Sequence, residues 1–205
     1  MKKRTWKDEM LDKEFCVAIF GSARIQKKDK SYKQIYELGR MLGERNIDIV
    51  TGGGPGLMEA ANSGHQDGSK KTGAHSIGLN IKLPKEQKPN SHLDLLKEFS
   101  SFTKRLDEFM FLSNAIVVAP GGVGTMLEML YAWQLVQVEH IHNIPIILLD
   151  DFWNGFSDWL KKEPLQKKYF SKEEFNMLFF AKNYSEVIKI IDSENKKFIK
   201  NRKKV

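Results

Sequence analysis

The sequence has only one cysteine, Cys16, and little that suggests a membrane or a secretory route. One cysteine cannot form an internal disulfide, which favours a reducing compartment. Cys16 lies in the apolar run Phe15–Phe20, where a buried, inert thiol is expected. No run of about 18 apolar residues is present to span a bilayer, and no apolar stretch directly follows the basic N-terminus. These absences predict a cytoplasmic protein with no membrane partner.

Metal-binding patterns are also missing. His140 and His142 are two residues apart, and no cysteine or carboxylate completes a zinc set with them. No Ser/His/Asp triad can be placed, and no lysine stands in a recognisable pyridoxal-phosphate context. We therefore expect neither a metal ion nor a cofactor.

The charge of the chain is positive and lies largely at its ends. The 205 residues carry 33 Lys and Arg against 26 Asp and Glu, a formal net charge of +7. Such a charge attracts nucleic acid, phosphorylated metabolites and acidic membranes. The basic tails cover about residues 1–13 and 196–205, and terminal lysine runs are usually solvated. Nucleic acid is therefore the least favoured partner.

Six apolar runs of strand length alternate with helical patterns. The predicted strands are Phe15–Phe20, Ile47–Thr51, Ser76–Ile81, Ala115–Ala119, Ile144–Leu149 and a weaker Met177–Ala181. The predicted helices are Ser31–Arg45, Gly56–Gln66, His92–Leu112, Thr125–Val138, Phe152–Lys168 and Tyr184–Lys200. The runs are continuously apolar, as in strands covered on both faces. The pattern predicts one α/β domain over residues 1–205, with a doubly wound, mostly parallel sheet and helices on both faces.

The strongest motif is the nine-residue string PGGVGTMLE (120–128), which follows a predicted strand and opens a helix. Gly121, Gly122 and Gly124 let the backbone approach a ligand closely. The free amides of the first helical turn and the helix dipole favour a phosphate there, and Thr125 adds a hydroxyl. No lysine follows the glycines as in a Walker A loop, and the dinucleotide spacing is absent. The motif favours a phosphomonoester ligand.

Glu128 has two interpretations of about equal weight. Its side chain leans back toward the helix start, where the carboxylate would hang over the phosphate loop. Alternatively, Thr125 and Glu128 form a capping box in which the Glu bonds only a backbone amide. Similar boxes at Ser31–Gln34 and Ser171–Glu174 make the capping interpretation serious.

Two other glycine-rich turns follow predicted strands. The string TGGGPGLME offers Gly53 and Gly54 for ligand contact, and tight helix–sheet packing is an equally good explanation. The turn after the first strand holds Gly21 and Ser22. Ser22 could contact a ligand or cap a helix, and Arg24 could pair with a phosphate or lie in solvent.

Arg105 lies in the predicted helix His92–Leu112, at the border of its apolar face. A guanidinium there could donate paired hydrogen bonds to a phosphate or to sugar hydroxyls. A surface ion pair with Glu108, three residues on, is the better interpretation from the residues alone.

These motifs resemble a known family. PGGVGTMLE matches the PGGxGTxxE signature of the LOG (Lonely Guy) family of nucleoside 5′-monophosphate phosphoribohydrolases, long labelled possible lysine decarboxylases. GGGPGLMEAAN (52–62) is similar to its second glycine motif, and residues 76–87 resemble its larger bacterial members. The likeness runs from Ala18 to about Leu149. It implies a Rossmann-like fold and a homodimer or larger homo-oligomer with the active site at the subunit interface.

The resemblance also implies an activity, namely the cleavage of AMP or a cytokinin riboside 5′-monophosphate to free base and ribose 5-phosphate. Such cleavage builds positive charge on the ribose, which a nearby carboxylate stabilises. The family's site residues fall on catalytic Arg105 and Glu128, on the phosphate loop Gly121, Gly122, Gly124 and Thr125, and on Glu86 for base or sugar contact. Leu106, where the family often has Lys, and Gln134, where plant-type members have Thr, depart from the pattern and bear on the choice of base.

Three hypotheses follow from the sequence. The first is an N-glycosyl hydrolase acting on a nucleoside monophosphate. The second is a non-catalytic nucleotide or molybdenum-cofactor carrier of similar fold, against which the intact pair of Arg105 and Glu128 argues. The third is nucleic-acid binding through the basic tails, which would show a steep salt dependence.

Overall fold

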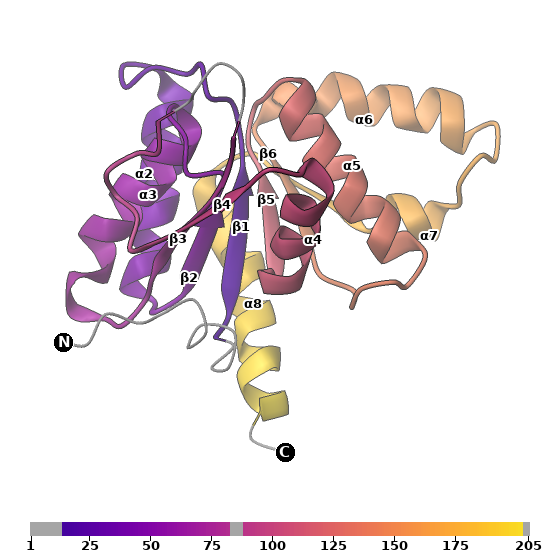
Figure 1. Cartoon of the computed structure of the whole chain (residues 1–205). Coiled ribbons are helices and arrows are strands. Elements are labelled where there is room, and N and C mark those ends of the chain that lie inside the picture. The colour runs from indigo at the N-terminus through magenta and orange to yellow at the C-terminus, as the bar shows by residue number, and fades with distance from the viewer. Residues whose placement is uncertain (1–13, 83–87, 203–205) are drawn as a thin grey trace.

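The computed structural model describes residues 14–82 and 88–202. Within these residues, seven strands form one sheet in the order β4-β3-β2-β1-β5-β6-β7 (Figure 1). The strands are β1 (Cys16–Phe20), β2 (Asp48–Thr51), β3 (Ser76–Ile81), β4 (Leu95–Phe99), β5 (Ala115–Val118), β6 (Ile146–Leu149) and β7 (Leu178–Ala181). Every neighbouring pair is parallel. The predicted α/β class is confirmed, and the described sheet is wholly parallel.

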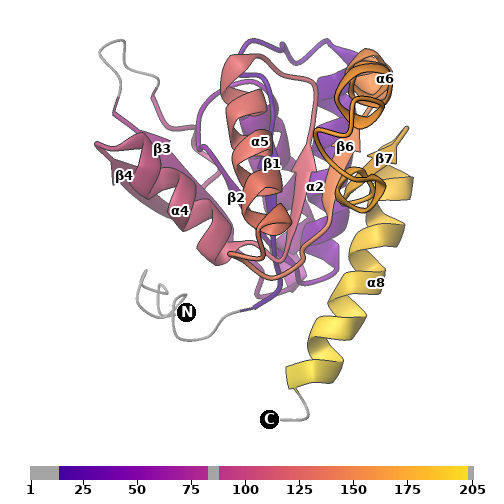
Figure 2. The ribbon, with the colours of Figure 1, turned by 90° about the vertical axis from the view of Figure 1, so that its right-hand side faces the viewer.

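Helices cover both faces of the sheet (Figure 2). On one face pack α2 (Lys30–Glu44), α3 (Leu57–Gly68) and α8 (Tyr184–Arg202). On the other pack α4 (Phe102–Leu112), α5 (Val123–Gln137) and α6 (Asn154–Leu160). The central strand β1 serves both cores, because Val17 and Ile19 face the first group of helices while Ala18 and Phe20 face the second. A strand buried on both sides must be continuously apolar, which explains the sequence pattern.

The order of the strands reverses at β1. β2, β3 and β4 follow one another outward on one side of it, and β5, β6 and β7 on the other. β1 and β5 are paired from Val17↔Ala115 to Phe20↔Val118, so the turns that leave their carboxyl ends lie side by side. In doubly wound sheets, such a switch point forms the crevice in which ligands bind.

The predicted helix His92–Leu112 is wrong in its first half. Residues 95–99 form strand β4, paired with β3 from Ile77↔Leu95 to Ile81↔Phe99, and α4 begins only at Phe102. β4 is the edge of the described sheet, and its residues alternate between more and less exposed positions. Its sequence LLKEF therefore lacks the continuous apolar character of the inner strands. Because it contains the charged residues Lys97 and Glu98, the pattern did not predict a strand there.

The six predicted strands are confirmed. All of them occur within two residues of their expected bounds.

The predicted helix Phe152–Lys168 is not continuous. It is broken into a 3₁₀ turn (Asp151–Trp153), α6 and a π-helical turn (Lys161–Leu165) that contains Pro164. A short helix α7 (Lys172–Phe175) follows. In the described part of the chain, no helix combines the length and the apolar character needed to span a bilayer.

Two expected capping boxes have different outcomes. The box at Ser171 and Glu174 is confirmed, since each side chain bonds the backbone amide of the other. The box expected at Ser31–Gln34 is wrong. α2 begins one residue earlier, after Asp29, and has no side-chain cap.

Candidate functional site

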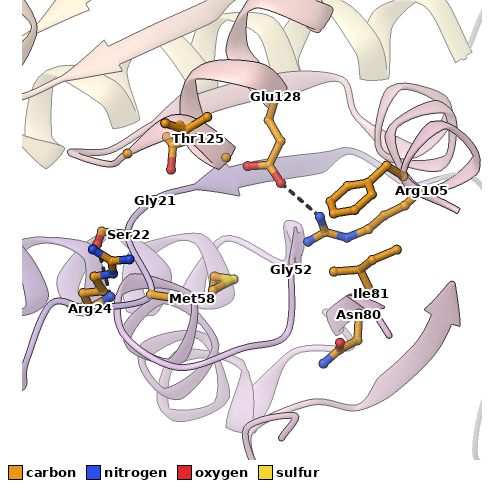
Figure 3. A pocket seen from close by; sticks show the side chains of 15 residues that line it. Gly21, Ser22, Arg24, Gly52, Met58, Asn80, Ile81, Arg105, Thr125 and Glu128 are labelled. Atoms are coloured by element: carbon orange, nitrogen blue, oxygen red, sulfur yellow. Dashed lines mark hydrogen bonds and ion pairs between the residues drawn. The ribbon is translucent and has the colours of Figure 1, made fainter. Parts of the chain in front are cut away.

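A cavity of about 610 Å³ opens at the switch point. Its walls come from the turns after β1, β2 and β5, from the end of β3 and from the first turns of α3, α4 and α5 (Figure 3). Its volume lies within the range of about 300–1,000 Å³ that is typical of small-molecule sites. The glycine-rich turns named from the sequence therefore meet around one cavity.

The loop before α5 presents bare backbone to this cavity. The N-cap of α5 is Gly122, and the helix begins at Val123. A Cβ placed on Gly122 or Gly124 would meet no atom within 4 Å, so both positions border open space. The free amides of the first turn and the positive end of the helix dipole therefore reach the cavity without a side chain in front of them. This arrangement suits an anion such as a phosphate.

Gly121 has a different part in the loop. A Cβ there would lie 2.1 Å from Thr125 Oγ1, so this glycine lets the loop pack against Thr125 and does not line the cavity. Thr125 is buried at the wall of the cavity, with its hydroxyl on the cavity side in Figure 3.

The capping interpretation of Thr125 and Glu128 is wrong. Thr125 lies inside the helix, three residues after the N-cap, and α5 has no side-chain cap. Instead, Glu128 Oε1 accepts a hydrogen bond of 3.3 Å from Nη1 of Arg105 (Figure 3). Both side chains line the cavity, and both are largely buried.

Burial changes the acid–base behaviour of this pair. Removal from water disfavours the carboxylate and raises the pKa of Glu128 from an ordinary 4.5 to about 7, although the positive charge of Arg105 lowers it in part. Burial likewise lowers the pKa of Arg105, against the attraction of Glu128. Near neutral pH, Glu128 is therefore able both to accept and to donate a proton, as a general acid or base must.

Arg105 is held on several sides. Its Nε donates to the carbonyl oxygen of Leu79 at 2.6 Å, and its guanidinium carbon lies 5.1 Å from the centre of the Phe109 ring. The expected surface pair with Glu108 is wrong, because Glu108 pairs with Lys97 at 2.9 Å while Arg105 is only 9% exposed. The guanidinium is thus fixed in one orientation beside Glu128.

The turn after β2 supplies Gly52 to the cavity wall. A Cβ on Gly52 would lie 2.5 Å from Nη2 of Arg105 and 2.7 Å from the sulfur of Met58. Gly53 and Gly54 were the expected contacts, and neither lines the cavity. The sequence named the correct motif, and only the packing of Arg105 identifies which of its glycines faces the cavity.

Gly53 and Gly54 belong instead to the frame of this turn. Gly53 has a φ of +69°, a conformation that glycine adopts readily. Its amide donates to Thr51 Oγ1, and its carbonyl accepts from the amide of Asn90 at 2.8 Å. The Asn90 side chain donates to the carbonyl of Gly54 and to Asn62. These bonds hold the turn against the sheet.

The turn after β1 closes the other side. The amide of Ser22 donates to the carbonyl of Pro120, and the carbonyl of Ser22 accepts from the amide of Leu57, so this turn ties the other two together. A Cβ on Gly21 would approach Leu57 to 3.0 Å, which explains this glycine by close packing as well as by its place at the cavity. Ser22 and Arg24 lie at the rim, across the cavity from Arg105 (Figure 3).

Sequence reasoning missed seven residues of the wall, namely Ala23, Gly52, Met58, Asn80, Ile81, Phe102 and Val123. A signal existed for one of them, because Asn80 is a polar residue near the carboxyl end of a predicted strand, directly after the apolar Leu79. Glu86 lies outside the described residues. Of the two departures from the family pattern, Leu106 is buried in the core region and Gln134 is exposed on α5. Neither lines the cavity.

No group of three or more His, Cys, Asp or Glu within residues 14–82 and 88–202 is arranged to hold a metal ion.

Comparison with known proteins agrees with this geometry. The sequence profile described as possible lysine decarboxylase matches residues 58–191, more than half of the chain. The chain belongs to the possible lysine decarboxylase (LOG) family. Glu128 and Arg105 both fall within the region that carries the family's pattern.

Two relatives in this family have names that state an activity. The probable cytokinin riboside 5′-monophosphate phosphoribohydrolase LOGL6 of Oryza sativa subsp. japonica is 30% identical over 82% of this chain and 67% of its own length. The pyrimidine/purine nucleotide 5′-monophosphate nucleosidase of Escherichia coli (strain K12) is 32% identical over 56% of this chain. The match covers only 26% of the E. coli protein.

Solved structures show the same fold. The molybdenum cofactor binding protein of Rippkaea orientalis has a TM-score of 0.66, at 20% identity, and the match covers 89% of this chain and 98% of that one. At this identity the likeness concerns the fold alone.

Proposed function

We propose that this LOG-family chain hydrolyses the N-glycosidic bond of a nucleoside 5′-monophosphate and releases free base and ribose 5-phosphate. The observation that carries the proposal is the buried Arg105–Glu128 pair, which shares one cavity with the open N-terminus of α5. The names of the rice and E. coli relatives support the same reaction class. AMP and cytokinin riboside 5′-monophosphates are the substrates we propose.

The phosphate would bind at the start of α5. Gly122, Gly124 and Thr125 offer backbone amides and a hydroxyl there, and the helix dipole favours the anion. Ser22 and Arg24 at the facing rim would add a hydroxyl and a positive charge. Binding of the phosphate at this point directs the attached ribose toward Glu128, which lies farther along the same helix.

Glu128 would act on the ribose and on water. As the C1′–N bond breaks, its electron pair leaves with the base and positive charge develops on the sugar ring. The Glu128 carboxylate stabilises this charge and accepts a proton from the water that adds to C1′, and the departing base takes up a proton in turn. Arg105 holds the carboxylate in place and keeps part of it ionised near pH 7.

The test is turnover. The purified protein, incubated with AMP and a panel of other monophosphates, should release free base that chromatography detects. Glu128→Gln should lower kcat by about 10²- to 10⁴-fold, while Glu37→Gln, which changes a surface carboxylate on α2, should leave it unchanged. A folded protein that binds nucleotides tightly and releases no base would instead support a carrier.

The oligomeric state belongs to the same proposal. α5 exposes a row of apolar side chains at a spacing of three and four residues, namely Val123, Met126, Leu127 and Leu130. Val123 is 85% exposed and lines the cavity. An apolar row of this kind on a helix surface is typical of a protein–protein contact. We propose that a second copy of the chain covers it, so that the cavity lies beside the subunit interface.

A further inference from the structure

Asn80 is a polar residue near the carboxyl end of β3, whose other polar residue, Ser76, accepts a hydrogen bond from Asn62. Asn80 is the next-to-last residue of β3 and pairs in register with Glu98 of β4. Only 6% of it is exposed, yet it lines the cavity. Within residues 14–82 and 88–202, its side-chain amide has no hydrogen-bond partner, and its nitrogen and oxygen are not among the fully enclosed atoms that lack one, as expected for a group that borders the cavity. A largely buried amide is normally satisfied, so this one is available to a ligand in the cavity.

The position of Asn80 matches one end of a nucleotide. In Figure 3 the side chains follow one another around the cavity in the order Thr125, Glu128, Arg105, Asn80. If the phosphate binds beside Thr125 and the ribose beside Glu128, the remaining part of the nucleotide points toward Asn80. The base would therefore reach the wall formed by the end of β3.

This wall has the character of a base-binding surface. Ile81, the residue after Asn80, and Phe102, the first residue of α4, line the same cavity and provide apolar area, and Phe102 is exposed. Flat aromatic bases gain affinity from such contacts, and a few polar groups then select among them. Asn80 is the polar group at this end of the cavity.

We propose that Asn80 recognises the base and that the site prefers 6-aminopurine nucleotides to 6-oxopurine nucleotides. This proposal rests on the proposed function. The amide of Asn80 presents a donor and an acceptor side by side, which match the acceptor N7 and the donor N6 of adenine. Hypoxanthine and guanine present two acceptors, N7 and O6, on the same edge, so the amide oxygen would face an oxygen and no second bond would form.

The test compares AMP with IMP, which differ at this edge. For the unmodified protein, kcat/KM should favour AMP on the order of 10- to 100-fold, the usual discrimination of one paired amide. Asn80→Leu should bring the ratio close to 1. Asn80→Asp, which is nearly isosteric, should weaken the binding of AMP and still favour AMP over IMP, because its carboxylate accepts from N6 of adenine and has no donor for N7 of either base. Glu98→Gln, at the register partner outside the cavity, should keep the ratio of the unmodified protein.

Equilibrium binding separates this proposal from the reaction. Calorimetry with AMP and IMP should show the same ratio of Kd values, lost in Asn80→Leu, even if no base is released. Equal kcat/KM or equal Kd for the two nucleotides in the unmodified protein would overturn the role of Asn80. A preference for AMP that survives in Asn80→Leu would overturn it too, as would a failure of AMP to bind.

Discussion

Gly52→Ala is the sharpest perturbation of the site that the structure offers. The added Cβ would lie 2.5 Å from Nη2 of Arg105, and ordinary contact begins at 3.4 Å, so the guanidinium must move by about 0.9 Å. Arg105 donates one hydrogen bond to Leu79 at 2.6 Å and another to Glu128 at 3.3 Å. A shift of this size breaks at least one of the two. Gly52 has no positive φ, so the backbone itself tolerates alanine.

The expected effect is on catalysis more than on folding. A misplacement of about 1 Å in a catalytic group costs on the order of 10²-fold in rate. We therefore expect kcat/KM for AMP to fall about 100-fold, or about 2.7 kcal/mol. Arg105 lowers the pKa of Glu128, so its displacement raises that pKa above about 7. If the carboxylate is the active form, the acidic limb of the pH–rate profile should move to higher pH.

The assay is AMP hydrolysis from pH 5 to 9, with thermal melting of the same samples. Gly155→Ala is the matched control, because a Cβ on Gly155 meets nothing within 4 Å and the residue does not line the cavity. It should leave the profile unchanged. A Gly52→Ala protein with the original kcat/KM and pH profile would refute the proposed catalytic role of the Arg105–Glu128 pair.

Three further outcomes are expected. Gly122→Ala should leave the melting temperature unchanged and raise KM for AMP about tenfold, because its Cβ enters only the proposed phosphate space. Gly121→Ala should destabilise the fold by about 1–3 kcal/mol, because its Cβ would collide with Thr125. Equal melting temperatures of the two variants would contradict this. Because burial raises the folded-state pKa of Glu128 from 4.5 to about 7, the folded protein loses stability from this group, up to about 3 kcal/mol, as pH rises through that interval. Melting of Glu128→Gln relative to the unmodified protein should therefore improve from pH 5 to pH 8, and a constant difference would argue against the raised pKa. Leu130→Glu should convert a dimer to a monomer in sedimentation equilibrium, and a monomeric unmodified protein would remove the proposed interface.

The inner strands of the sheet were predictable because each is covered on both faces. β1, β5 and β6 read as unbroken apolar runs, and their bounds agree with the structure within two residues. β4 was not predictable in this way. It lies at the edge of the described sheet and carries Lys97 and Glu98, so its five residues looked like part of the helix that follows. The run of apolar residues along the chain therefore predicts a strand only where helices cover both faces of that strand.

The glycine turns show the same limit at the site. Their place after strands identified the sheet edge, and the string PGGVGTMLE identified the loop before α5. Which glycines face the cavity depended on neighbours far along the chain. Gly52 faces it because Arg105 packs there, while Gly121 is required by Thr125. Only the second of these contacts lies within one motif.

The sequence by itself determined the alternation of strands and helices, the three glycine turns at one edge of the sheet and the family. Only the tertiary structure decided that Arg105 turns from Glu108 toward Glu128, 23 residues away, and that Gly52 and Asn80 join them. The reason is physical, because secondary structure follows from the local pattern of apolar residues. The pairing and burial that set a pKa depend instead on elements brought together by folding.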